Sequence, residues 1–112
     1  MATSIMKNPN QVLAWRYVDE KTGTTSIALP ELFNEVLLIA KWGRNTQLTV
    51  STIFAYNELS GNYLRRLLGN YAASNDYHNV QIDCYKTQAH IVCWKSNSGD
   101  QTSTSKLQAY VR

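Results

Sequence analysis

The clearest alternation of apolar and polar positions lies at the C-terminal end of the chain. In residues 106–112, Leu107, Ala109 and Val111 alternate with polar and aromatic neighbours. Strict alternation over this length predicts a half-buried strand, because successive side chains of a strand point to opposite faces of the sheet. We therefore expect this segment to pair within a sheet and to bury those three side chains.

Alternating patterns of the same kind predict most of the other strands. The strands expected on this basis cover residues 12–18, 24–29, 47–54, 78–85 and 89–95. Turn residues that end at Gly23 predict that the first two strands pair as an antiparallel hairpin, and residues 86–88 predict a tight turn in the last pair. Together with residues 106–112, these segments indicate an all-β, mainly antiparallel fold, a compact β-sandwich of about six to seven strands.

Residues 31–42 are compatible with either a helix or a strand. Leu32 and Val36 have helical spacing, and Pro30 is acceptable in the first turn of a helix. A loop followed by a buried strand over residues 35–42 fits the same pattern. Periodicity alone does not decide between the two structures.

Residues 62–71 present a similar conflict, although the local pattern favours a helix. Ser60 is a suitable N-cap and Gly69 a suitable stop. The apolar residues fall on one face of such a helix; they are Tyr63, Leu64, Leu67, Leu68 and Tyr71. The local pattern therefore predicts one short helix near residues 59–68 in an otherwise all-β chain.

Length, composition and charge narrow the class of protein. The chain has 112 residues, of which 17% are charged and 11% aromatic, which fits one folded domain and not a disordered chain. We expect a flexible N-terminal lead-in over residues 1–10 and a single β-sandwich domain over residues 11–112. The net charge of +3 without a run of Lys or Arg argues against a nucleic-acid partner. The longest apolar run, residues 36–40, is too short to span a bilayer, and the N-terminus lacks an apolar signal segment.

The predicted C-terminal hairpin places the two cysteines near each other. With residues 86–88 as its turn, Cys84 lies opposite Ile91 and Cys93 opposite Ile82, so both thiols share one face as diagonal neighbours. Their expected separation of about 7–8 Å is at the limit of what a disulfide bridges. We therefore expect buried free thiols that act as small apolar side chains. Because no cysteine and histidine spacing typical of a metal site occurs, we expect no metal.

No catalytic motif is present in the sequence. His90 faces away from both cysteines in the predicted hairpin, so no Cys–His pair is expected. The carboxylates form no close pair of the kind that glycoside hydrolysis needs, and no Gly-rich phosphate-binding motif occurs. The segment Ser98-Gly99-Asp100 lacks the further oxygen ligands of a calcium loop. We therefore expect neither an enzyme nor a cofactor. An enzyme would need a carboxylate pair or a Cys–His contact that the fold brings together from distant parts of the sequence.

Aromatic residues are the better indication of function. In the predicted hairpin, Tyr85, His90 and Trp94 share one face, and Tyr110 lies on the polar face of the terminal strand. If exposed, these faces form either a subunit interface or a platform for stacking sugars, because aromatic rings supply large contact area at low entropy cost. The alternative is that the face of Trp94 packs against the second sheet. The candidate ligand or interface residues are Trp94, Tyr85, Tyr110, Tyr77 and Trp42.

The order of several short motifs resembles a known class of proteins. The motifs are Trp15-Arg16-Tyr17, Thr-Gly-Thr-Thr-Ser-Ile-Ala-Leu-Pro over 22–30, Phe33-Asn34-Glu35, Gly69-Asn70-Tyr71, a Gly-Asp-x-Thr-Ser loop over 99–103 and the closing Tyr110-Val111-Arg112. Across roughly residues 12–112, this order is similar to that of small β-rich modules in tail-fibre and other virion structural proteins of phages and prophages of gut bacteria. Such modules usually end in two aromatic residues before arginine, where this chain has Tyr110 and Val111.

The resemblance implies both structure and function. It implies a strand over residues 35–42 and an extended stretch around residues 63–68 in place of the helix. It also implies a non-catalytic phage virion protein, an oligomeric module for host-surface attachment or for capsid or tail decoration, of head-fibre or tail-fibre type. Because fibre proteins are usually homotrimers, the implied partners are further copies of the chain, other virion proteins and a host-surface glycan.

The implied location is the virion. Phage proteins are made in the host cytoplasm and leave by lysis, which needs no signal peptide, and neither a nucleic-acid partner nor membrane insertion is expected. The alternative is a bacterial carbohydrate-binding or adhesin-like module, in which sugars would stack on Trp94, Tyr77 or Trp42.

Overall fold

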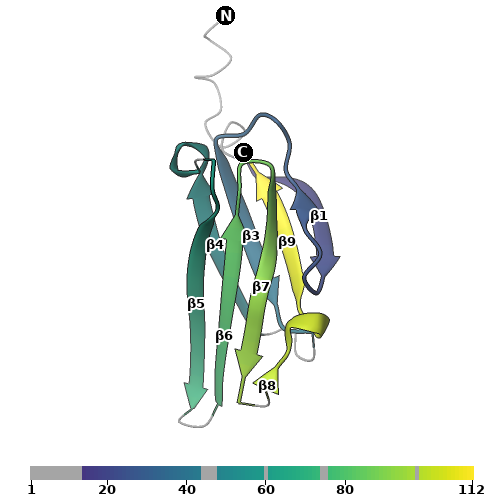
Figure 1. Cartoon of the computed structure of the whole chain (residues 1–112), viewed down its shortest axis with the longest axis vertical. Helices are drawn as coiled ribbons and strands as arrows, with labels where there is room; N and C mark the ends of the chain where they lie inside the picture. Colours follow the sequence, from purple (N-terminus) through teal and green to yellow (C-terminus); the bar gives the residue numbers. More distant parts are fainter. Residues whose placement is uncertain (1–13, 44–47, 60, 74–75, 98) are drawn as a thin grey trace, which may run out of the picture.

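The chain folds as a β-sandwich. The computed structural model describes residues 14–43, 48–59, 61–73, 76–97 and 99–112, with the backbone alone over residues 70–73 and at residue 76. In this part of the chain, antiparallel strands form two sheets that pack face to face (Figure 1). The all-β sandwich predicted from the sequence is therefore confirmed. The expected lead-in, residues 1–10, lies outside the described residues.

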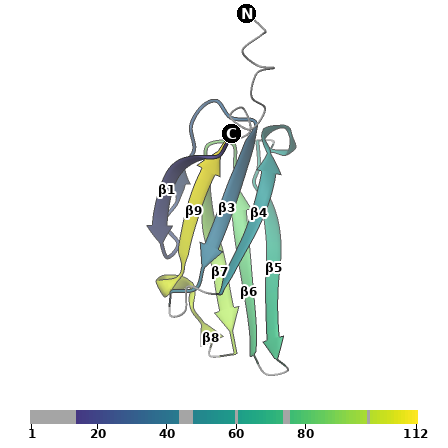
Figure 2. The same ribbon diagram turned by 180° about the vertical axis from the view of Figure 1, so that it is seen from behind.

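The two sheets are named A and B here. Sheet A contains, in spatial order, β1 (Arg16–Thr22), β9 (Lys106–Val111), β3 (Glu35–Lys41) and β4 (Thr49–Ala55), as Figure 2 shows from its outer side. Sheet B contains β2 (Ile27–Ala28), β7 (Gln88–Ser96), β6 (Asp76–Cys84) and β5 (Leu64–Ala73), and the short β8 (Gly99–Asp100) also pairs with β7. Two short 3-10 turns are η1 (Tyr56–Glu58) and η2 (Thr102–Thr104). The described residues thus form nine strands, two of them only two residues long, against six to seven expected.

The core lies between the sheets and is built by alternation. In β9, Leu107, Ala109 and Val111 are at most 1% exposed, so the predicted terminal strand and its three buried side chains are confirmed. Other core residues come from both sheets: Val36, Leu38, Ala40, Phe54, Val80, Ile82, Ile91 and Trp94. Burying each large apolar side chain contributes about 1.5–3 kcal/mol, and this term holds the two sheets together.

The N-terminal strands do not form the predicted hairpin. β1 runs through the expected turn at residues 19–23 and pairs with β9, whereas β2 pairs with β7 in the other sheet. The turn at Gly23, where φ is 77°, instead carries the chain from sheet A to sheet B, and its N–H donates to Ser105 O at 2.8 Å. The turn signal therefore marks a crossing between sheets. Residues 12–13 of the first predicted strand lie outside the described residues.

The segment that allowed either a helix or a strand before Trp42 is a strand. β3 pairs with β4 as a hairpin in which Leu37 lies opposite Ile53. The strand expected over residues 35–42 is confirmed and the helical alternative is wrong. Its pattern was ambiguous because β3 carries apolar residues on both faces, so the period of two is hidden.

The short helix predicted near residues 59–68 is wrong. Residues 64–73 form β5, which pairs along its length with β6, and the extended stretch implied by the resemblance is confirmed. Two residues conceal the strand pattern. Leu67 points outward and is 70% exposed, whereas Arg66 occupies an inward position between Leu64 and Leu68.

Arg66 is accommodated there by contacts with β4. Its guanidinium carbon lies 4.2 Å from the centre of the Phe54 ring. Its Nη1 donates to Thr52 Oγ1 at 2.8 Å and to Ile53 O at 2.6 Å, and its Nη2 pairs with Glu58 Oε2 at 3.1 Å. The cation is thus bonded to the edge of sheet A while its aliphatic stem packs inward.

β6 and β7 form a hairpin, as predicted, but with another register and with a bulge. Cys84 lies opposite Ala89 and Cys93 opposite Gln81, so the predicted pairings of Cys84 with Ile91 and of Cys93 with Ile82 are wrong. Ile82 pairs with Ile91, whereas Gln81 pairs with Cys93, so Val92 is an extra residue in β7. A shift of one residue moves every following side chain to the opposite face. The faces predicted for Cys93 and Trp94 are therefore wrong.

Candidate binding surfaces

Trp94 is part of the core and not of an exposed face. After the bulge it points inward and is 1% exposed. Its backbone N–H donates to Thr102 Oγ1 at 2.8 Å. The prediction that Trp94 shares a face with Tyr85 and His90 is wrong, and its ring packs against the second sheet, as the alternative stated.

Trp42 is half-buried and also packs against the core. Its ring lies 4.7 Å from that of the buried His78, measured between centroids, at a tilt of 48°. The indole Nε1 atom of Trp42 is buried by other residues that the structure describes. Trp42 thus packs against the core and is only partly accessible to solvent.

The two cysteines lie on opposite faces of sheet B. Cys84 is in the core, where burial raises the pKa of its thiol to about 12. Cys93 is half-buried and points outward because of the bulge. Both are free thiols, as expected, but the prediction that they share one face is wrong.

The outer face of sheet A carries a row of apolar side chains that crosses its four strands. Tyr17 on β1 lies opposite Tyr110 on β9, and these rings meet edge to face at 5.6 Å between centroids. Tyr110 in turn lies opposite Leu37, which lies opposite Ile53. Tyr17 is 59% exposed and Ile53 40% exposed. These four residues are called the sheet A row, and Ile39 extends it along β3.

Charged side chains flank the sheet A row at both ends. Beyond Tyr110, Arg112 Nε donates to Glu35 Oε1 at 2.8 Å. Beyond Ile39, Lys41 and Lys106 are direct cross-strand neighbours. Two like charges directly opposite each other repel and destabilise the sheet. The face is therefore an apolar strip with a charged rim.

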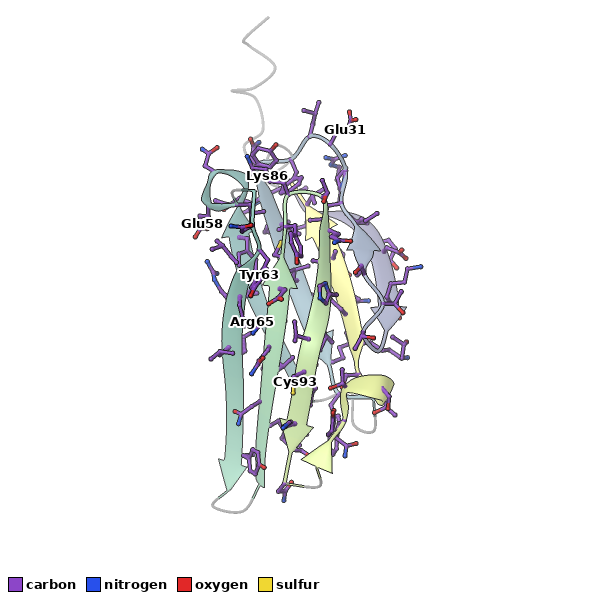
Figure 3. The ribbon with its side chains drawn as sticks, in the orientation of Figure 1. Glu31, Glu58, Tyr63, Arg65, Lys86 and Cys93 are labelled. Carbon is purple, nitrogen blue, oxygen red and sulfur yellow. The ribbon has the colours of Figure 1, made fainter. Side chains whose placement is uncertain are left out.

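The upper part of sheet B carries an aromatic cluster. Tyr63 and Tyr85 meet edge to face at 5.7 Å, and the His90 ring stacks on Tyr85 at 6.4 Å. Arg65 lies over Tyr63 and forms two hydrogen bonds with the buried Asp83, Nε–Oδ1 at 2.7 Å and Nη2–Oδ2 at 3.1 Å. This pairing raises the pKa of the Arg65 guanidinium. Figure 3 shows Tyr63 and Arg65 along β5, below Glu58 and Lys86.

The lower part of sheet B is hollowed by two shallow depressions that share Asn79 and Gln81. One is lined by Leu67, Leu68, Gly69, Asn79, Val80 and Gln81. The other is lined by Tyr77, Asn79, Gln81, Cys93 and Lys95, and Cys93 is labelled there in Figure 3. Because the two depressions adjoin along β6, they are together called the β5–β7 groove.

Asp100, at the end of β8, organises the start of η2. Its Oδ1 accepts hydrogen bonds from Thr102 Oγ1 at 2.6 Å and from Thr102 N at 2.9 Å. These bonds lower the pKa of the Asp100 carboxyl, because they stabilise its charged form. An open depression next to it is lined by Thr22, Gly23, Thr24, Thr25, Asp100, Thr102 and Ser103.

The carboxylates of Asp83, Glu35 and Glu58 are each engaged by an arginine. Within the described ranges, no three His, Cys, Asp or Glu side chains gather into a potential metal site. Nor do these ranges contain a helix that is long and apolar enough to cross a membrane.

The five predicted site residues do not form one surface. Tyr110 lies in the sheet A row, Tyr85 in the upper aromatic cluster and Tyr77 in the groove, whereas Trp94 and Trp42 pack against the core. Sequence reasoning missed the aliphatic members of the sheet A row and the amides of the groove. The apolar run at residues 36–40 was a signal for the former, because it makes both faces of β3 apolar. Comparison of the chain with protein-family models, curated proteins and solved structures found no match.

Proposed function

We propose that this chain is a non-catalytic phage virion structural protein, an oligomeric β-module that attaches to the host surface or decorates the capsid or tail. The motif order described above supports the virion class. The observation that carries the oligomeric part is the sheet A row. It places an apolar strip across the outer face of an antiparallel sheet, where a solvated face is normally polar.

The sheet A row has the composition of a subunit interface. Interfaces combine an apolar, aromatic-rich centre with a polar rim. Here Tyr17 and Tyr110 supply aromatic area, Leu37 supplies the centre, and the charged pairs supply the rim. A second copy of the chain is the occupant we propose, in a homotrimer as the resemblance implies. An acidic side chain of a neighbouring copy would relieve the repulsion between Lys41 and Lys106.

The test is the mass of the assembly in solution. Light scattering after size exclusion, at micromolar protein, is expected to give the mass of three chains. Leu37→Lys should dissociate the assembly, because it places a charge in the centre of the row; Tyr17→Ser, at its exposed edge, should weaken it with less risk to folding. Leu32→Asp is the matched control, since Leu32 is 85% exposed but lies in the loop before β3.

Two results would contradict the proposal. If the wild-type chain is strictly monomeric at micromolar concentration, the proposed oligomeric state is refuted. Dissociation by the control variant as well as by Leu37→Lys shows that another surface holds the copies together. The virion class is tested separately, by mass spectrometry of particles purified from a lysate of a strain that carries the gene.

A bacterial carbohydrate-binding or adhesin-like module is a second candidate. The β5–β7 groove favours it, because amide and aromatic side chains on a sheet face suit a sugar. A monomer that is absent from purified virions but binds glycans would support this candidate over the first.

A further inference from the structure

Three outward side chains of β6 form a column along the floor of the β5–β7 groove. They are Tyr77, Asn79 and Gln81, at successive outward positions of the strand. Such positions recur about every 7 Å, so the column is extended and matches a chain-like ligand better than a compact one. Asn79 is exposed, whereas Tyr77 and Gln81 are half-buried.

The charge of the groove excludes several ligand classes. Among the residues that line it, Lys95 is the charged one, and it lies opposite Asp100 in the β7–β8 pairing. Because the Asp100 carboxylate lies near enough to interact with this single positive charge, the groove has only a weak attraction for phosphates, nucleic acids or acidic peptides. Amide groups both donate and accept hydrogen bonds. Hydroxyl groups do the same, so a neutral polyhydroxyl ligand is the chemical complement of Asn79 and Gln81.

The shape of the groove depends on Gly69. A Cβ at this position would lie 3.1 Å from Asn79 Oδ1, so the glycine lets that amide lie close against β5. Next to it on the outer face, Leu67 is 70% exposed. An exposed leucine beside polar amides suits the C–H face of a sugar ring, which is apolar while its edge carries hydroxyls.

We propose that the β5–β7 groove binds a neutral oligosaccharide. Tyr77 and Leu67 contact the C–H faces of the sugar rings, and Asn79 and Gln81 bond to the hydroxyls. This inference rests on the proposed function, because it names the ligand class of the attachment step. It uses sheet B alone, so the sheet A row stays available for assembly and one oligomer presents several grooves.

The first experiment measures binding by the full-length chain. A printed array of neutral and acidic bacterial-surface oligosaccharides selects a probe, and the best neutral one is titrated by calorimetry. Asn79→Ala and Gln81→Ala are each expected to weaken binding about tenfold, the loss that follows from about 1.4 kcal/mol for a hydrogen bond. Gly69→Ser is expected to weaken it by displacing the Asn79 amide, which lies 3.1 Å from the position of the new Cβ. Gln108→Ala is the matched control, because Gln108 is a half-buried outward amide of sheet A.

The second experiment uses Cys93 as a reporter. Cys93 lines the groove, whereas Cys84 is buried with a pKa raised to about 12 and should not react. Saturation with the selected oligosaccharide is expected to slow alkylation of Cys93 at least severalfold. The Gln81→Ala variant should lose this protection in proportion to its weaker binding.

The outcomes separate this inference from the proposed function. The inference is overturned if no neutral oligosaccharide binds, if Gln108→Ala weakens binding as much as Gln81→Ala, or if the ligand leaves Cys93 alkylation unchanged. An oligomer that shows any of these results keeps its proposed structural role and loses the glycan site. A monomer that binds through the groove has the glycan site without the proposed assembly.

Discussion

Replacing Gly43 by alanine tests how closely two loops of the sandwich approach each other. Gly43 follows β3, and η2 lies against it. A Cβ at this position would collide with the carbonyl oxygen of Thr104 and would lie 2.6 Å from its carbonyl carbon. Both obstacles are backbone atoms, which cannot rotate away as a side chain can. One of the two loops must therefore move.

The expected cost follows from that geometry. Overpacking a well-filled site costs about 1–3 kcal/mol, and a backbone obstacle places this variant in the upper part of the range. Movement of η2 also disturbs the hydrogen bonds that join Asp100, Thr102 and Trp94. For a domain of this size, about 2–3 kcal/mol corresponds to a fall in Tm of roughly 10–15 °C.

Gly61→Ala is the control in the same assay. A Cβ at Gly61 meets nothing within 4 Å, so alanine is expected to be neutral or to stabilise by about 0.4–1 kcal/mol through the unfolded chain. Urea unfolding followed by tryptophan fluorescence measures both variants, at one protein concentration because oligomerisation shifts apparent stability. A Gly43→Ala variant within about 0.5 kcal/mol of the wild type would refute the close approach.

Three further predictions concern the core, the thiols and the pH dependence. Trp94→Ala should lose about 3–5 kcal/mol of unfolding free energy in urea, and a loss below about 1 kcal/mol would contradict the burial of its ring. Brief iodoacetamide treatment should add one adduct in intact-mass spectrometry, at Cys93 and not at Cys84, because the pKa of the Cys84 thiol is raised to about 12. Two adducts would contradict the burial of Cys84. The pKa of Asp100 is lowered by its hydrogen bonds to Thr102, so the stability they contribute is present at neutral pH and lost as the pH falls through that lowered pKa. The Tm difference between wild type and Asp100→Asn should therefore shrink on acidification. A difference that stays constant with pH would contradict a stabilising role of the ionised Asp100 carboxylate.

The strands of the core could be predicted where burial is periodic. β9 buries Leu107, Ala109 and Val111 and exposes the residues between them, so its pattern has one interpretation. β3 carries apolar residues on both faces, and β5 places Arg66 inward and Leu67 outward. In these two strands the resemblance indicated the extended structure that the local pattern left open or misread.

The candidate surfaces could be predicted only in part. Tyr110, Tyr85 and Tyr77 were identified from their strand positions and belong to three separate surfaces on the outer faces of the sheets. Trp94 was assigned to the wrong face because the bulge at Val92 reverses the faces of the residues that follow it in β7. The sequence of this strand and of the turn before it does not indicate an extra residue. The β5–β7 groove depends on Gly69, whose role as a gap between neighbouring strands is visible only once β5 is paired with β6.

The contacts of Arg66 bear on whether a further strand can pair with the edge of sheet A. β4 is an edge strand of sheet A, and an edge with free carbonyls is a template for adding strands without end. Arg66 bonds to the Ile53 carbonyl from the neighbouring sheet, so an incoming strand would have to displace a charged group. A single arginine from sheet B thus hinders strand addition at this edge of sheet A.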